Sequence, residues 1–141
     1  MHTHESSELL DLEHTLARVT APWVAELGLR VLRAGPGEVV LALPVAARLV
    51  HSGGVLSGQA LMAAADTAMI LAIATKIGGF KPMTTVQLQT SFLRPVAGDS
   101  GEAQVIARVL RLGKNLVFGE IEIFNVKGEL CAHATTTYAL L

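Results

Sequence analysis

The feature that most constrains the fold is a nearly unbroken apolar run, rich in alanine, over residues 58–75. Its length and composition predict a long helix. Ser57 stands immediately before the run, where a serine side chain can cap the first turn of a helix. Gly78 and Gly79 follow the run and predict its end.

One acidic residue, Asp66, lies in the middle of this helix and is the only charge between Arg48 and Lys76. Its neighbours three and four positions away are all apolar: Met62, Ala63, Met69 and Ile70. Removing a carboxylate from water without a partner is costly, so a carboxylate in such surroundings is either paired or functional. Asp66 is therefore the first candidate for a functional residue.

Most of the remaining chain reads as strands. Before the helix, residues 29–32 and 38–43 are predicted to form a hairpin around a Pro-Gly turn. After the helix, four strands are predicted at residues 84–93, 102–112, 116–125 and 130–140. These elements predict an α+β fold, in which a curved antiparallel sheet of about six strands wraps around one long helix.

The first 20 residues are predicted to form a packing helix, with Ser7 as its N-cap and leucines at helical spacing. Ala21 and Pro22 close this helix. His2 and His4 precede it in a segment that we expect to be a mobile, solvated tail. Residues 21–141 are expected to form a single domain.

Composition narrows the possible partners. The chain is 51% hydrophobic and only 16% charged, with a mean hydropathy of +0.49. This predicts apolar surface buried between subunits, and hence an oligomer. The net charge of -1 and the 4% aromatic content give no footprint for nucleic acid or an anionic membrane. Because Asp66 interrupts the apolar run and no signal peptide opens the chain, we expect a cytoplasmic protein.

Metal and redox chemistry are not indicated, and no cofactor is expected. Cys131 is the only cysteine, so it cannot form an intrachain disulfide, and its apolar strand predicts a small buried side chain. No pair of histidines has the spacing, together with a glutamate, of a zinc-hydrolase helix. The five histidines are His2, His4, His14, His51 and His133.

Several segments together carry a family resemblance over nearly the whole chain. They are residues 57–59 and 65–68, residues 85–95 with 98–99, residues 113–114, and residues 132–138. The chain resembles hot-dog-fold acyl-CoA thioesterases of the phenylacetate-degradation type. In such families the helix begins at a His-Gly-Gly turn, and an acid follows nine residues after the histidine. Here Ser57 stands at the histidine position, Gly58 and Gln59 at the two glycine positions, and Asp66 at the acid.

The resemblance implies a homodimer or a dimer of dimers, with the active site at the subunit interface. The backbone N–H of Gly58 would hold the thioester oxygen, and Asp66 of the opposite subunit would act as general base or nucleophile. Ser57 in place of histidine leaves a hydroxyl that caps the helix, binds water, or does both. His51 lies where family members often carry an asparagine, so it is a candidate for orienting the water or the acid, although a loop histidine is as often merely solvated.

Substrate-binding candidates follow from the same resemblance. Arg94, Arg111 and Lys114 lie near predicted strand ends and could meet the phosphates of CoA, with Lys114 preferred and plain solvation as the alternative. Gln59 would face the substrate at the turn. The candidates for lining an acyl channel are Met62, Met69 and Phe92, although such residues more often pack in the core. Met62 is retained among the substrate-binding candidates.

Two other functions are compatible with parts of the sequence, and two further kinds of site are excluded. An enoyl-thioester hydratase or dehydratase of the same fold would need a histidine working with the acid, which only His51 could supply. A non-catalytic acyl-CoA-binding protein would be consistent with Ser57 at the histidine position. A serine-hydrolase elbow is excluded because Val55 stands where its first glycine belongs. No Lys-Ser or Lys-Thr follows Gly58, so a phosphate-binding loop is excluded too.

Overall fold

The computed structural model describes residues 2–141, with side chains from residue 7 onward. These residues form the helices α1 (His2–Val19), α2 (Pro22–Ala25) and α3 (Gly58–Ile77), and a 3-10 turn at Ala47–Leu49. The strands are β1 (Arg30–Gly35), β2 (Glu38–Pro44), β3 (Met83–Phe92), β4 (Glu102–Leu112), β5 (Leu116–Phe124) and β6 (Leu130–Leu140).

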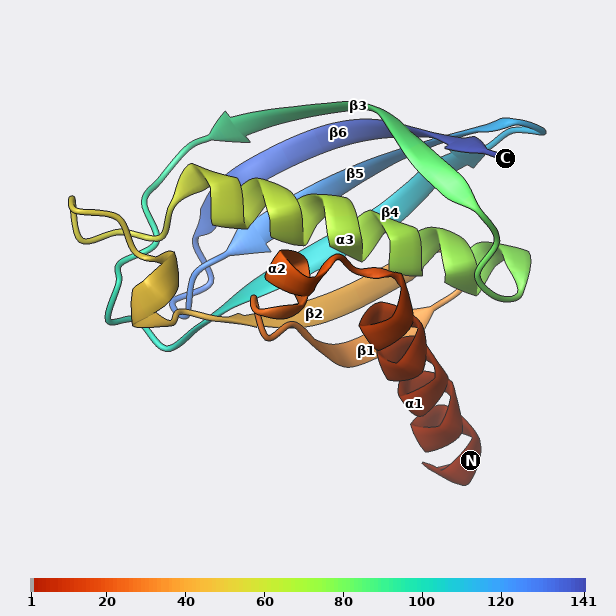
Figure 1. Cartoon of the computed structure of the whole chain (residues 1–141), viewed down its shortest axis with the longest axis horizontal. Helices are drawn as coiled ribbons and strands as arrows, with labels where there is room; N and C mark the ends of the chain where they lie inside the picture. The colour runs from red at the N-terminus through yellow and green to blue at the C-terminus, as the bar shows by residue number, and fades with distance from the viewer. Residues whose placement is uncertain (1) are drawn as a thin grey trace.

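All six strands join one antiparallel sheet in the order β1-β2-β4-β5-β6-β3. The sheet curves around α3, which runs along its concave face (Figure 1). The predicted α+β architecture is therefore confirmed. The largest difference in strand bounds is at β1, which continues past Leu32 because its pairing with β2 extends to Gly35 and Glu38.

Helix α3 has the ends that the sequence predicts. Ser57 is extended at its N-cap, and its side chain accepts a hydrogen bond from the Ala60 N–H. Gly78 ends the helix in the left-handed conformation at φ 82°, where a side chain would be strained. Most of the helix is buried, and its many alanines allow the sheet to approach closely.

The core lies between α3 and the concave face of the sheet. Side chains alternate along the strands, so that every second residue of β5 points to the helix while its glutamates point away. Fully buried members include Leu41, Leu43, Val105, Ile121 and Ile123. Cys131 is also fully buried, which confirms its prediction as a small apolar side chain, and burial raises the pKa of its thiol.

The prediction that Ser7 caps the first helix is wrong, because α1 begins at His2 and Ser7 lies inside it. Extending an existing helix adds one backbone hydrogen bond for each residue fixed, and one exposed serine does not stop it. The side chains of His2 and His4, which were expected to be solvated, are outside the described part of the chain.

The two edges of the sheet differ. At β1, helix α1 covers the edge, and the side chain of Glu13 accepts the Val31 N–H at 2.5 Å. At the other edge, β3 pairs only with β6 among the described residues. None of the ten residues of β3 is charged or a proline, the residue types that usually protect an exposed edge.

Helix α3 is long and apolar enough, by length and composition, to cross a membrane. However, 61% of its most apolar 18-residue stretch is buried inside the fold. It is the core helix of this domain.

Candidate active site

The N-terminus of α3 presents free backbone donors. Gly58 is the first residue of the helix, and the first N–H groups of a helix have no acceptor within it. Among residues 2–141, no carbonyl or side chain accepts the Gly58 N–H. Gly58 lies against the ring of Phe92, since a Cβ added to it would be 3.2 Å from a ring carbon. A Cβ here would require the ring to shift by a few tenths of an ångström, whereas glycine leaves the backbone open to close approach.

Ser57 is engaged in structure. Its backbone N–H donates to the Leu49 carbonyl at 2.9 Å, and its hydroxyl accepts the Ala60 N–H at 3.2 Å. Of the roles considered for this hydroxyl, helix capping is therefore the one present in the chain.

Asp66 is half-buried and is held by two hydroxyl groups. Thr85 Oγ1 on β3 donates to Asp66 Oδ1 at 2.9 Å. The Tyr138 hydroxyl on β6 lies 2.5 Å from the same oxygen and 2.9 Å from the main-chain carbonyl oxygen of Asp66. The carboxylate is thus paired with neutral donors, and the described residues place no cation on it.

Tyr138 is 1% exposed. Burial, and then the nearby charge of Asp66, raise the pKa of Tyr138 well above its usual value. The phenol therefore keeps its proton and donates to the carboxylate. Neither Tyr138 nor Thr85 is among the site residues that the sequence predicts. One signal was available, because Tyr138 is the only tyrosine of the chain and a buried tyrosine hydroxyl needs a partner.

The uncovered face of α3 continues on both sides of Asp66. Gln59, Met62 and Asp66 follow one another at helical spacing. Gln59 is exposed and Met62 is 36% exposed. Phe92 on β3 is 52% exposed, whereas Met69 is fully buried and belongs to the core. The prediction of core packing is therefore confirmed for Met69. It is wrong for Met62 and Phe92 within one chain, because neither the sheet nor a helix covers these two side chains.

His51 lies in the exposed loop before α3. Its Nδ1 accepts the Gly53 N–H at 2.8 Å, which folds the imidazole back onto its own loop. Within the described chain, no hydrogen bond joins His51 to Asp66, whose side-chain partners are Thr85 and Tyr138.

The basic candidates lie at opposite ends of the sheet. Arg94 follows β3, at the end where α3 begins, and its guanidinium is 3.4 Å from the Glu129 carboxylate. Lys114 is exposed in the turn between β4 and β5, towards the C-terminal end of α3 (Figure 1). Arg111 is exposed near the same turn.

Gly58 and Asp66 do not meet within one chain. They are eight residues apart on the same helix, which at 1.5 Å per residue separates them by about 12 Å along the axis. One thioester carbonyl cannot touch both groups at that separation. Each chain therefore carries a free backbone N–H at one place and a carboxylate at another.

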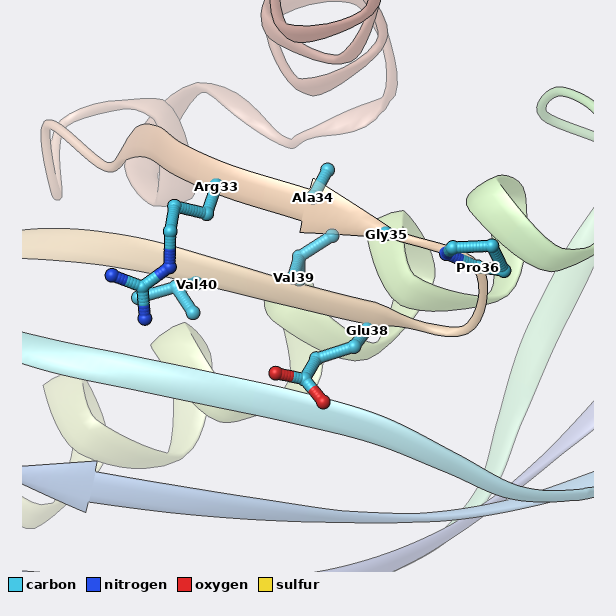
Figure 2. Close-up of a pocket in the computed structure, with 7 residues that line it drawn as sticks. All are labelled: Arg33, Ala34, Gly35, Pro36, Glu38, Val39 and Val40. Carbon is cyan, nitrogen blue, oxygen red and sulfur yellow. The ribbon is translucent and has the colours of Figure 1, made fainter. Parts of the chain in front are cut away.

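A shallow pocket of about 330 Å³ lies elsewhere, at the hairpin of β1 and β2 (Figure 2). Arg33 and Glu38 project from the hairpin beside Val40. None of its lining residues belongs to α3, β3 or β6. Glu38 also pairs with Arg108 at 3.3 Å. Within the described part of the chain, no three His, Cys, Asp or Glu side chains gather as a metal site would require.

A six-stranded antiparallel sheet curved around one long helix, with a carboxylate midway along that helix, defines a hot-dog-fold protein. The family model of the Thioesterase superfamily matches residues 53–132, which include Gly58, Asp66 and most of the sheet. The chain belongs to the Thioesterase superfamily and is a thioester hydrolase.

Individual relatives agree with this assignment. A candidate esterase of Thermoplasma volcanium is 31% identical over 112 residues, which cover 74% of this chain and 76% of that protein. The phenylacetic acid degradation protein PaaI of Thermus thermophilus, in a mutant form, is 30% identical with a TM-score of 0.75, covering 86% of this chain and 100% of that one. A thioesterase of Haemophilus influenzae is 26% identical with a TM-score of 0.81, covering 92% and 90%.

Proposed function

We propose that the protein hydrolyses acyl-CoA thioesters in a site shared between two subunits. The Gly58 N–H of one subunit binds the thioester oxygen, and Asp66 of the other acts on water or on the carbonyl carbon. The observation that carries this proposal is the separation of the two groups along α3, which requires the second group to come from another chain.

The open edge at β3 supports a dimer built on that side of the molecule. A long uncharged edge strand is a template for another strand. Apolar side chains on β3 and on the neighbouring face of α3 remain exposed in one chain: Met62, Val86 and Phe92. Pairing β3 with its copy in a homodimer, or in a dimer of dimers, would cover these side chains and bring each Asp66 towards the partner's helix.

The proposed reaction begins with a water molecule between Asp66 and the thioester. The carboxylate takes a proton from the water, whose oxygen forms a bond to the carbonyl carbon. The electron pair of the carbonyl moves to its oxygen, where the Gly58 N–H and the helix N-terminus stabilise the negative charge. When the intermediate collapses, the carbon–sulfur bond breaks, and the CoA thiolate leaves and receives the proton from Asp66. Direct attack by the carboxylate, followed by hydrolysis of the anhydride, gives the same products.

Charge and apolar surface are available for the rest of the substrate. A shared site would receive Arg94 from the subunit that supplies Gly58 and Lys114 from the subunit that supplies Asp66. Both side chains are exposed and suit the phosphates of CoA. Met62 and Phe92, with Gln59 at the mouth, are the proposed contacts for the acyl group.

The hydratase alternative depends on His51 acting with Asp66. The imidazole faces Gly53 instead, so the geometry of the chain favours hydrolysis. The binding-protein alternative predicts saturable binding of acyl-CoA without release of thiol.

The proposal is tested by thiol release from short-chain, long-chain and aromatic acyl-CoAs, with Asp66→Asn and wild type compared as folded proteins. Aromatic substrates are included because one relative is named for phenylacetic acid degradation. We expect wild-type hydrolysis that falls about 10²–10⁴-fold in Asp66→Asn, because the amide cannot take a proton from water. Asp11→Asn, which makes the same change on the exposed side of α1, should leave the rate unchanged.

Three results would reject the proposal. Equal activity in Asp66→Asn would make the carboxylate structural. Hydration of enoyl-CoA without thiol release would identify the hydratase, and binding without any turnover would identify a binding protein.

A further inference from the structure

The carboxylate of Asp66 is held asymmetrically. Thr85 Oγ1 and the Tyr138 hydroxyl both approach Oδ1, at 2.9 Å and 2.5 Å, from two different strands. No group among the described residues donates to Oδ2. Two donors on one oxygen fix the rotation of the carboxylate and leave its second oxygen free.

The two donors differ in their exposure. Tyr138 belongs to the core, whereas Thr85 is exposed on β3 next to the irregular pairing at Val86. A purely structural pairing would account for Tyr138 alone, because a buried phenol must find an acceptor and the main-chain carbonyl of Asp66 lies 2.9 Å away. It does not account for Thr85, which could donate to water and instead donates to the oxygen that Tyr138 already holds.

No other titratable group competes for Asp66 within the described chain. Strand β3 carries no charged side chain. On β6, His133 points to the other face of the sheet, where its imidazole pairs with Glu120 at 3.1 Å. The residues of β4 and β5 that face α3 are alanine, valine, isoleucine and glycine. The two hydroxyls are thus the groups that set the environment of this carboxylate.

We propose that Tyr138 and Thr85 are positioning residues, which hold Asp66 by Oδ1 and present Oδ2 as the oxygen that acts on water or on the thioester. This inference rests on the proposed role of Asp66 in hydrolysis.

The test is the separate measurement of kcat and KM for Tyr138→Phe and Thr85→Val, with Thr85→Ser as the conservative control. Each of the first two changes removes one donor from Oδ1, so the carboxylate rotates more freely and Oδ2 is less often aimed at the water or the thioester. A fall in kcat of about tenfold is expected for each change. KM should change little, and Thr85→Ser should keep the wild-type kcat.

The outcomes separate this inference from the proposed function. If Asp66→Asn, measured in parallel, keeps its activity, the role of Asp66 fails and the positioning role fails with it. If Asp66→Asn is inactive but folded Tyr138→Phe and Thr85→Val keep the wild-type kcat, only the positioning role is overturned. Should Tyr138→Phe fail to fold, Thr85→Val decides the matter, because its exposed side chain is not needed for the core.

Discussion

At the scale of single residues, the proposed reaction depends on one backbone N–H, that of Gly58, and on one carboxylate, that of Asp66. Gly58 is the first residue of α3, and its N–H is unused in the described chain. Asp66 has one oxygen held by hydroxyls, and no described residue donates to the other. A donor and a base placed in this way match the needs of thioester hydrolysis.

The role of the Gly58 N–H can be tested by Gly58→Pro. Proline is favoured at the first position of a helix, and Ser57 already has the extended conformation that a residue before proline requires. The change therefore removes the donor without breaking a hydrogen bond of the chain. We expect kcat to fall by about 10²–10³-fold in a folded protein, as when an oxyanion donor is lost.

Gly58→Ala is the matched control. It adds the same Cβ beside Phe92 but keeps the N–H, so it should lose far less activity than Gly58→Pro. Equal losses in the two variants would show that the side chain blocks the substrate, and that the N–H has no special role.

The sequence alone could identify half of this site. Asp66 was evident as a lone charge in an apolar helix, and Gly58 followed from its place in the turn that the chain shares with hot-dog-fold thioesterases. Thr85 and Tyr138 could not be assigned to Asp66, because their approach depends on strand pairing. That pairing shifts register between Thr85 and Gln87, and no local pattern of residues predicts such a shift.

At the scale of elements, the contact between α3 and the sheet is close. Strand β5 passes the helix at Gly119, where an added Cβ would lie 2.3 Å from the Met69 Cε and 2.8 Å from the main-chain oxygen of Arg108. A glycine at this position lets the helix and the neighbouring strand pack without a void or a clash.

Gly119→Ala should therefore destabilise the fold by about 1–3 kcal/mol, because the core is overpacked and the backbone of β4 cannot move aside. Urea unfolding measures the loss. Gly35→Ala provides the comparison, since an added Cβ at Gly35 would meet nothing within 4 Å. A loss as large for Gly35→Ala as for Gly119→Ala would show that packing against Met69 is not the cause.

The elements themselves were largely predictable. Capping and glycine signals located both ends of α3, and alternation located the strands. The start of α1 was missed, because Ser7 has the chemistry of a cap but lies within a helix that extends to His2. Burial was partly misjudged, since Met62 and Met69 are both methionines of α3 and only the position of the sheet distinguishes them.

At the scale of the whole molecule, the asymmetry between the two sheet edges is the main feature. Helix α1 covers β1, while β3 leaves its outer edge open beside an exposed apolar face of α3. An edge of this kind favours association with a second copy, which would also complete the proposed site.

Val86→Lys should prevent this association, because a lysine on an edge strand opposes pairing with another chain. We expect a smaller particle by sedimentation and a parallel loss of hydrolysis. Leu10→Lys is the control, since Leu10 is 55% exposed, close to the 60% of Val86, but lies on α1, which covers the opposite edge of the sheet. A monomeric Val86→Lys that still hydrolyses thioesters would contradict a shared site.

The most direct measurement is the activity of a mixed dimer. One subunit carries Gly58→Pro and the other Asp66→Asn, and differently tagged copies are purified together. A shared site predicts one intact site of the two, and therefore about half of the wild-type rate of thiol release, although each variant alone is nearly inactive. A mixed dimer no more active than the two single variants would contradict a site shared between subunits.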